Sequence, residues 1–201
     1  MKRWMTAVTG LAALLGGGLA GAAGTTLDNL QAAYSAESNG MAHYEAFAAK
    51  ADAEGYKSVA LLFRATADSV GIHARNLAGI IKKMKAEPKA TPQPFVVKST
   101  RENLEASLKG DLSVEGSIYP AYMKQAEAEK KFEAAMAFEG NLKTETEHVK
   151  FFQAALGDLD GWKSGGKEIA VCQVCGYTVM GSVPARCAVC GSPREKFKKM
   201  K

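Results

Sequence analysis

Apolar residues recur at every third or fourth position through most of the chain, which is the period of an α-helix with one buried face. Glycine and proline residues interrupt this pattern. Gly55 ends the first periodic segment, and Pro88 closes the second. Ser99 opens the third with capping-box spacing to Glu102, and Pro120 should bend it. The pattern therefore predicts four helices, over residues 27–54, 57–86, 99–130 and 132–156.

The segment between the second and third predicted helices holds three prolines. Residues 87–94 contain Pro88, Pro92 and Pro94, so this segment should cross over in extended form rather than as a helix. Two helical hairpins joined by a long crossover are typical of a ferritin-like four-helix bundle. We therefore predict a mainly α protein with such a bundle over residues 27–157.

A weak internal repeat supports the pairing of the two hairpins. Tyr44 lies 29 residues before His73, and Tyr119 lies 29 residues before His148. Duplication of one hairpin is the simplest origin of this spacing. The third histidine, His43, is assigned to an exposed or partly exposed helix face.

The first 23 residues follow a different pattern. Lys2 and Arg3 form a short positive start, an uncharged apolar run follows, and small residues end the segment. This order is typical of a secretory signal peptide. We expect residues 1–23 to be removed and the mature protein to be exported, to the periplasm in a Gram-negative bacterium, with no stable membrane span left. The alternative is a protein anchored by an uncleaved N-terminal segment.

The charge balance weighs against nucleic acid as a partner. The formal net charge of the chain is +5, and without Lys2 and Arg3 it has 24 basic and 21 acidic residues. A nucleic-acid binder usually shows a stronger and more clustered positive charge. Only the tail over residues 194–201 is locally basic, which is typical of a solvated segment.

After a predicted linker over residues 158–166, the pattern changes to the short strands and turns of a small domain over residues 167–201. This domain holds four cysteines in two Cys-x-x-Cys pairs: Cys172, Cys175, Cys187 and Cys190. Each pair presents two sulfurs to one point, so the four thiolates should surround one metal ion. Two disulfides are the alternative in an exported chain. We expect this domain and the bundle to have separate cores.

The cysteines belong to a longer motif. Cys-x-x-Cys-Gly-Tyr is followed by Gly181, Pro184, the second Cys-x-x-Cys, Pro193 and Phe197. This order resembles the rubredoxin-like domain that ends members of the rubrerythrin family, although Ala188 stands where the family usually has proline. The resemblance extends over residues 27–201. It favours iron at the four cysteines; the alternative is zinc in a ribbon-like structural module, since both ions take this geometry.

The resemblance also implies a di-iron site inside the bundle. The family ligands are a Glu on the first helix, Glu-x-x-His on the second, Glu-x-x-Glu on the third and Glu-x-x-His on the fourth. Five positions of this sequence carry a suitable ligand, and we take them as both metal-binding and catalytic: Glu37, His73, Asp111, Glu145 and His148.

Two positions of the implied ligand set carry valine instead. Val70 stands three residues before the histidine of the second helix, and Val114 stands three residues after Asp111. Each valine removes a carboxylate that would compensate the charge of a metal. We therefore expect one or two iron ions, bound more weakly and better on the side of Asp111, Glu145 and His148. Glu115 is an alternative ligand if the helix adjusts locally.

The resemblance implies reduction of hydrogen peroxide to water. The bundle irons would deliver two electrons to the O–O bond, and the four-cysteine iron would resupply them from a reductase or cytochrome. It also implies a homodimer in which the cysteine domain of one subunit approaches the bundle of another. The alternative is an electron-transfer or metal-binding protein with a degenerate bundle site that is not a competent peroxidase.

Overall fold

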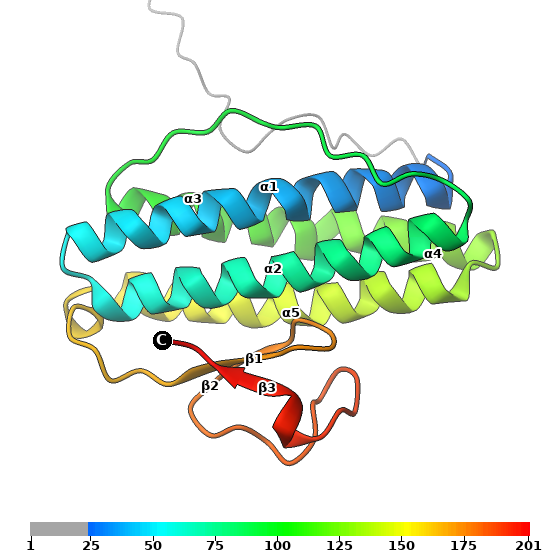
Figure 1. The fold of residues 1–201 in the computed structure, drawn as a ribbon. Coiled ribbons are helices and arrows are strands. Elements are labelled where there is room, and N and C mark those ends of the chain that lie inside the picture. Colours follow the sequence, from blue (N-terminus) through cyan, green and yellow to red (C-terminus); the bar gives the residue numbers. More distant parts are fainter. Residues whose placement is uncertain (1–23) are drawn as a thin grey trace, which may run out of the picture.

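The computed structural model describes residues 24–201, so the predicted signal peptide lies outside the described residues. The chain forms a bundle of long helices with a small sheet against one side (Figure 1). The helices are α1 (Thr26–Ala53), α2 (Lys57–Lys83), α3 (Thr100–Ser113), α4 (Tyr119–Ala128) and α5 (Phe132–Gly157). The prediction of a mainly helical, ferritin-like fold is confirmed. Within residues 24–201, no helix combines the length and apolar content that crossing a membrane requires.

The two helical hairpins begin in the same way. Thr25 caps α1 in a capping box with Asp28, and Ser99 caps α3 in a capping box with Glu102. In each box the hydroxyl accepts a bond from the third helical N–H, and the acidic side chain accepts one from the cap backbone. These equivalent starts are the local counterpart of the repeat seen in the sequence.

Each hairpin also caps the other. Glu54, just after α1, accepts hydrogen bonds from the backbone and hydroxyl of Thr100, at 2.8 and 2.6 Å. Glu129, just after α4, accepts a bond of 3.1 Å from the backbone N–H of Thr26. An acidic group at a helix N-terminus satisfies free N–H groups and complements the helix dipole. The two halves of the bundle are therefore tied together at both ends.

The third predicted helix is interrupted just before Pro120. A π-helical segment, Val114–Ile118, separates α3 from α4, and Pro120 lies in the first turn of α4. Seven residues separate Glu37 from Tyr44 on α1, whereas eight separate Asp111 from Tyr119. A π segment absorbs one extra residue, so both carboxylates can keep the same relation to their tyrosines. The irregularity is a widened turn rather than the simple bend expected at Pro120.

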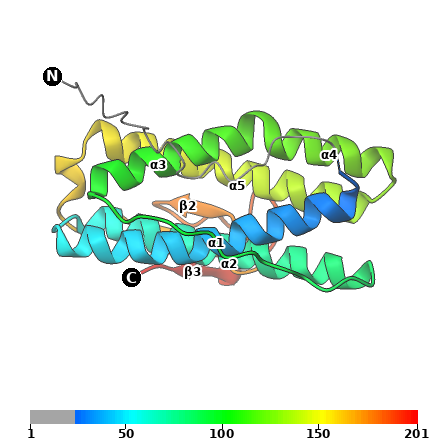
Figure 2. The same ribbon diagram turned by 90° about the horizontal axis from the view of Figure 1, so that it is seen from above.

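The extended crossover between α2 and α3 runs along α1 (Figures 1 and 2). Side chains four residues apart on α1, namely Gln31, Ser35 and Asn39, each accept a bond of 2.9–3.0 Å from its backbone. His43 continues this row and packs against Phe95, with ring centres 4.1 Å apart and the rings tilted by 40°. His43 is only 7% exposed, so its assignment to an exposed face is wrong. The crossover covers that face of α1, and burial lowers the pKa of His43.

The C-terminal segment forms a three-stranded antiparallel sheet in the order β2-β1-β3. Its strands are β1 (Ile169–Cys172), β2 (Thr178–Met180) and β3 (Phe197–Lys199), and short 3-10 turns cover Asp160–Trp162 and Arg194–Lys196. The sheet lies against α2 and α5, on the side of the bundle away from the crossover (Figure 1).

The expectation of two separate cores is wrong. Ile169 and Val171 of β1 and Trp162 of the linker belong to the same buried cluster as Phe63 of α2 and Phe152 of α5. The linker is also hydrogen-bonded to the start of α2, where the Ser58 hydroxyl donates a bond of 2.6 Å to the carbonyl oxygen of Ser164. The bundle and the small sheet therefore fold around shared apolar contacts.

Candidate metal centres

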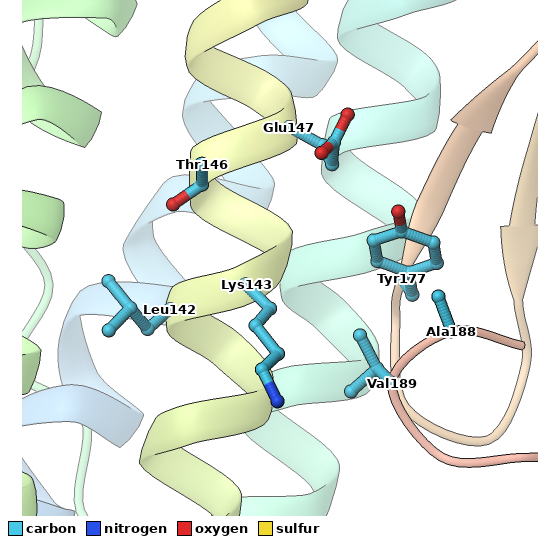
Figure 3. Close-up of a pocket in the computed structure, with 7 residues that line it drawn as sticks. All are labelled: Leu142, Lys143, Thr146, Glu147, Tyr177, Ala188 and Val189. Atoms are coloured by element: carbon cyan, nitrogen blue, oxygen red, sulfur yellow. The ribbon is translucent and has the colours of Figure 1, made fainter.

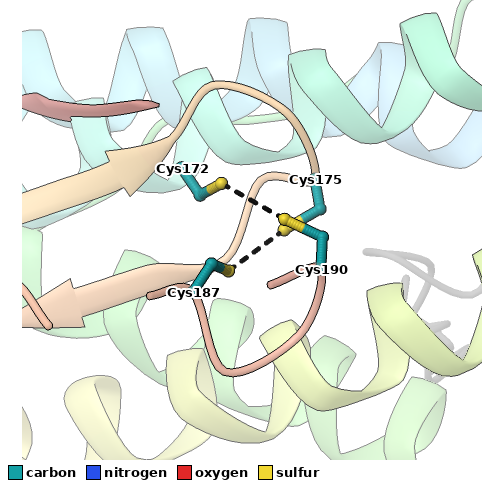
Figure 4. A group of neighbouring side chains, drawn as sticks. All are labelled: Cys172, Cys175, Cys187 and Cys190. Carbon is teal, nitrogen blue, oxygen red and sulfur yellow. Dashed lines mark hydrogen bonds between the residues drawn. The ribbon is translucent and has the colours of Figure 1, made fainter. Parts of the chain in front are cut away.

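The four cysteines converge at one point between two loops (Figure 4). The sulfurs of Cys172 and Cys190 are 3.7 Å apart, and those of Cys175 and Cys187 are 3.6 Å apart. Sulfurs placed 2.3 Å from a common ion at tetrahedral corners would lie about 3.8 Å from one another. A disulfide would hold them at about 2.0 Å, and all four cysteines are free. The spacing fits a four-thiolate metal site and not the disulfide alternative.

The turns after the two Cys-x-x-Cys pairs are equivalent. Gly176 donates a backbone bond of 2.8 Å to Cys172, and Gly191 donates one of 2.9 Å to Cys187. Both glycines have positive φ, at 85° and 71°, which a residue with a side chain rarely adopts. Burial raises the pKa of the Cys175 thiol. A bound cation would favour the thiolate that burial disfavours.

The five predicted bundle ligands also converge. They form two groups that share Glu145: Glu37 and His73 complete one, and Asp111 and His148 complete the other. The ligand atoms within each group lie within 4.8 Å of one another, and every one of these side chains is buried. Nδ1 of His73 is 3.3 Å from Glu37 and 3.4 Å from Glu145, and Nδ1 of His148 is 3.0 Å from Glu145.

Two tyrosines hold the outer carboxylates in a reciprocal way. The Tyr44 hydroxyl of α1 donates a bond of 3.2 Å to Asp111 of α3, and the Tyr119 hydroxyl of α4 donates one to Glu37 of α1. Asn141 of α5 is 3.4 Å from the same Glu37 oxygen. Burial raises the pKa of both tyrosines, so these hydroxyls stay protonated and act as donors.

The electrostatics of the bundle group fit a bound cation. Burial alone would lower the pKa of His73, but the negative charges of Glu37 and Glu145 beside the ring raise it to about 10. Burial together with the charge of Glu145 raises the pKa of Asp111 well above its usual value. Three carboxylates packed around two imidazoles therefore need positive charge, from protons on the histidines or from metal ions.

Buried atoms without a hydrogen-bond partner also support a metal site in the bundle. Within the described residues 24–201, Asp111 Oδ2, Glu145 Oε1 and His73 Nδ1 are buried without a hydrogen-bond partner of good geometry. The ion-pair distances of His73 are short enough for attraction, but their angles do not make hydrogen bonds. Buried polar atoms are normally satisfied, so buried ligand atoms of this kind beside the carboxylates fit the binding of a cation. The residues present therefore fit a metal site.

The two valines leave the site short of carboxylates. A shift of 75 residues relates Tyr44 to Tyr119 and His73 to His148, and the same shift relates Val70 to Glu145. Val70 is 4% exposed and packs in the apolar core. The position equivalent to the shared carboxylate is thus apolar in the first hairpin.

The acidic side chains near the site do not replace the missing ligands. Glu115 accepts a bond of 3.0 Å from the Thr146 hydroxyl and is not in either ligand group. Asp68 turns to the small sheet, where it accepts a bond of 2.8 Å from Gln173 and pairs with Lys198. Asp68 therefore faces away from the candidate metal site.

The cysteine loop touches both bundle histidines. A side chain at Gly176, next to Cys175, would place its Cβ 2.6 Å from His73 Nε2. Thr178 Oγ1 lies 3.0 Å from His148 Nε2. The Ser69 hydroxyl of α2 donates a bond of 2.7 Å to the Gly176 carbonyl and fixes this approach. The two candidate metal centres are thus separated by a single layer of residues within one chain.

Sequence reasoning missed Ser69 and Thr178, which join the two centres, and Asn141, which contacts Glu37 inside the bundle. None belongs to a metal-ligand spacing, and each is a common polar residue on an otherwise apolar element. The available signal was weak: Thr178 stands three residues after Cys175, and the distance from there to His148 is set only by the docked sheet.

A groove lies between α5 and the cysteine loops (Figure 3). It has a volume of about 330 Å³ and is lined by Leu142, Lys143, Thr146, Glu147, Tyr177, Ala188 and Val189. Val189 approaches α5 closely at Gly140, where a Cβ would lie 3.3 Å from its methyl group. Ala188, the departure from the family pattern, lies at the rim of this groove.

A bundle with paired carboxylate–histidine ligands and a four-cysteine domain define a class of two-centre metal proteins. A family model for rubrerythrin matches residues 28–156, and a model for the rubredoxin-like domain of rubrerythrins matches residues 171–198. The chain therefore belongs to the rubrerythrin family.

Individual relatives agree with this assignment. Nigerythrin of Nitratidesulfovibrio vulgaris is 30% identical over 177 residues, covering 88% of this chain and 87% of that protein. Rubrerythrin of Porphyromonas gingivalis is 31% identical over 180 residues, covering 88% of this chain and 90% of that protein. The structure of fully reduced, all-ferrous nigerythrin covers 99% of this chain and 100% of its own, with a TM-score of 0.82 and 28% identity.

Proposed function

We propose that this protein is an iron-dependent peroxide reductase of the rubrerythrin type. It would convert hydrogen peroxide, two electrons and two protons into two molecules of water. The single observation that carries the proposal is the contact of the cysteine loop with both bundle histidines, through Gly176 and Thr178. A two-electron reaction in the bundle needs a nearby source of single electrons, and the four-cysteine site stands next to it.

The residues have distinct tasks in this proposal. Glu37, His73, Asp111, Glu145 and His148 would hold iron in the bundle, and the four cysteines would hold one further iron. Iron bound at the two centres would supply the electrons, received one at a time at the cysteines from a reductase or cytochrome. Tyr44 and Tyr119 orient the outer carboxylates by donating hydrogen bonds from groups that stay protonated. The buried cluster around the site excludes bulk water.

A second candidate function is supported by Val70 and Val114. With two carboxylates absent, the bundle would hold one metal ion or none, and the protein would act in electron transfer or metal binding. Since the shared Glu145 serves both groups, one ion would occupy the side with Asp111 and His148.

Iron stoichiometry and turnover distinguish the two functions. The protein is loaded with ferrous iron without oxygen, and peroxide consumption is followed with a rubredoxin-reducing donor. The proposal expects about three irons per chain and peroxide turnover. One or two irons without turnover would establish the second function. Cys187→Ser serves as the control, because it should remove the visible absorption of the four-cysteine iron and the donor-dependent turnover. Circular dichroism must show its helices intact, since the two domains share a core.

The family resemblance supports a homodimer, but the contacts within one chain make a self-contained relay the simpler proposal. Mixing the variants Cys187→Ser and Glu145→Gln tests it. A relay within one chain predicts no recovery of activity in the mixed dimer, because neither chain has both centres. Recovery of up to half of the parent activity would show that the cysteine domain serves the partner's bundle.

We also propose that the protein is exported after removal of residues 1–23. The supporting observation is their order of positive, apolar and small residues. Mass spectrometry of the protein recovered from its native host should give a mature chain that starts near residue 24. An intact Met1 on a cytoplasmic protein would exclude export, and an intact Met1 in the membrane fraction would indicate an uncleaved anchor.

A further inference from the structure

A threonine of the small sheet binds a predicted metal ligand of the bundle. Thr178, the first residue of β2, is 1% exposed. Its Oγ1 lies 3.0 Å from His148 Nε2 and 3.2 Å from the carbonyl oxygen of Gly176. No other hydrogen-bond partner of His148 Nε2 is found among residues 24–201. The hydrogen bond to Thr178 therefore determines whether Nε2 of His148 acts as a donor or as an acceptor.

The donors and acceptors can be assigned from elementary chemistry. A carbonyl oxygen only accepts and has two lone pairs, so Gly176 can take both the Ser69 hydroxyl at 2.7 Å and the Thr178 hydroxyl. When Thr178 donates its single proton to Gly176, its oxygen is left to accept a bond from His148. Nε2 of His148 then carries a proton, so in the neutral ring the lone pair of Nδ1 would be available to a metal held by Glu145 and Asp111. This is the tautomer that a metal-binding imidazole needs.

We propose that Thr178 is a positioning residue for the bundle metal site. Its hydroxyl, held by the carbonyl that follows Cys175, fixes the ring of His148 with Nδ1 directed at the site. A ligating histidine normally donates its other N–H to such a partner, which sets the tautomer and the ring orientation. The inference rests on the proposed function, because it requires a metal in the bundle. It goes further by making metal affinity in the bundle depend on the docked cysteine domain.

The other bundle histidine lacks an equivalent partner. Nε2 of His73 faces Gly176, and it has no hydrogen-bond partner of good geometry among residues 24–201. The two histidines are related by the internal repeat, but within residues 24–201 only His148 has a hydrogen bond at Nε2. Thr178 should therefore act on one half of the site, the half with Asp111.

The test measures metal affinity in three variants with the four-cysteine site already filled with iron. Mn(II) is titrated into the bundle without oxygen, and the dissociation constant is compared with that of the parent. Thr178→Val, which keeps the shape but loses the hydroxyl, should weaken binding by about 10- to 100-fold. Thr178→Ser should bind close to the parent. Thr66→Val is the matched control, since Thr66 is also fully buried and the one side-chain hydrogen bond found for it within residues 24–201 goes to Leu62 of its own helix.

A second measurement reads the tautomer directly. Nitrogen-15 NMR of the protein loaded with diamagnetic Zn(II) at both centres should show His148 protonated at Nε2 and not at Nδ1. A proton on Nδ1, parent-like affinity of Thr178→Val, or a Ser variant as weak as Val would each overturn the positioning role. If the parent bundle binds no metal at all while the cysteines are filled, the proposed function fails and the positioning role fails with it.

Discussion

The two hairpins of the bundle are equivalent in their capping but differ at the candidate metal site. Both have a capping box, a tyrosine that holds the opposite carboxylate, and an acidic residue that caps the other hairpin. The first hairpin supplies Glu37 and His73, with Val70 at the position of the shared carboxylate. The second supplies Asp111, Glu145 and His148. The comparison teaches that an architecture can keep its symmetry where helices are capped and packed, while the ligands diverge because few residues set metal affinity.

The largest effect is expected at the carboxylate that both halves share. The oxygens of Glu145 lie 3.4 Å from His73 Nδ1 and 3.0 Å from His148 Nδ1. Glu145→Gln should abolish binding in both halves, a loss greater than the about 100-fold typical of an outer partner. Glu37→Gln should affect only the first half. Ferrous titration followed by Mössbauer spectroscopy measures both. Equal losses in the two variants would mean that the halves are not distinct.

The second prediction concerns a variant that gives the first hairpin a carboxylate like that of the second. Val70→Glu puts a carboxylate at the position equivalent to Glu145. Without metal, the buried charge should destabilise the fold by about 3 kcal/mol, measured by chemical denaturation. With iron, the loss should shrink because the metal pairs with the new carboxylate, and the iron count should rise.

Val70→Gln is the control for this variant, since the glutamine side chain has nearly the same shape as glutamate but carries no charge. The Val70→Gln variant should gain no iron. The double change Val70→Glu with Val114→Glu should give two bundle irons and faster peroxide turnover. If the parent already holds two bundle irons with full turnover, the valines do not weaken the site.

A smaller difference is expected between the two tyrosines. Tyr44→Phe removes the one hydrogen bond found for Asp111 within residues 24–201, whereas Glu37 keeps Asn141 when Tyr119 is changed to Phe. Each loss should cost about 1 kcal/mol, with the larger loss for Tyr44→Phe because it leaves a buried carboxylate without a donor. Denaturation of the metal-free variants measures the difference. A larger loss of stability for Tyr119→Phe than for Tyr44→Phe would contradict this prediction.

The smallest effect concerns the caps. Hydrogen bonds from Thr100 lower the pKa of Glu54 from 4.5 to about 2. A lowered folded-state pKa means that this contribution to stability is present above pH 4.5 and is lost as the pH falls toward 2. Glu54→Ala should therefore destabilise the protein by about 1 kcal/mol at pH 7, and less at pH 3. Thermal unfolding at the two pH values measures this. An equal loss at both pH values would show that the carboxylate charge does not matter.

Local rules predicted much of the fold. The helical period, the capping boxes and the prolines set four helices and the crossover, because these features depend on neighbours within a few residues. The spacing of the cysteines predicted a convergent site for the same reason. The π segment was missed because one extra residue becomes visible only when α1 and α3 are compared in space. His43 was misplaced because the crossover that buries it lies fifty residues away.

The sequence by itself determined which side chains could bind metal: four thiolates at fixed spacing, and five carboxylate and imidazole groups on predicted inward faces. Val70 and Val114 stand at two positions where the family resemblance implies carboxylates. Only the tertiary structure decided that Glu145 belongs to both ligand groups, that β1 shares the core of the bundle, and that Thr178 reaches His148. The physical reason is that the type of ligand is a property of a single residue. Which ligands come together, and where the small sheet packs on the bundle, depends on the burial of apolar surfaces that are distant in sequence.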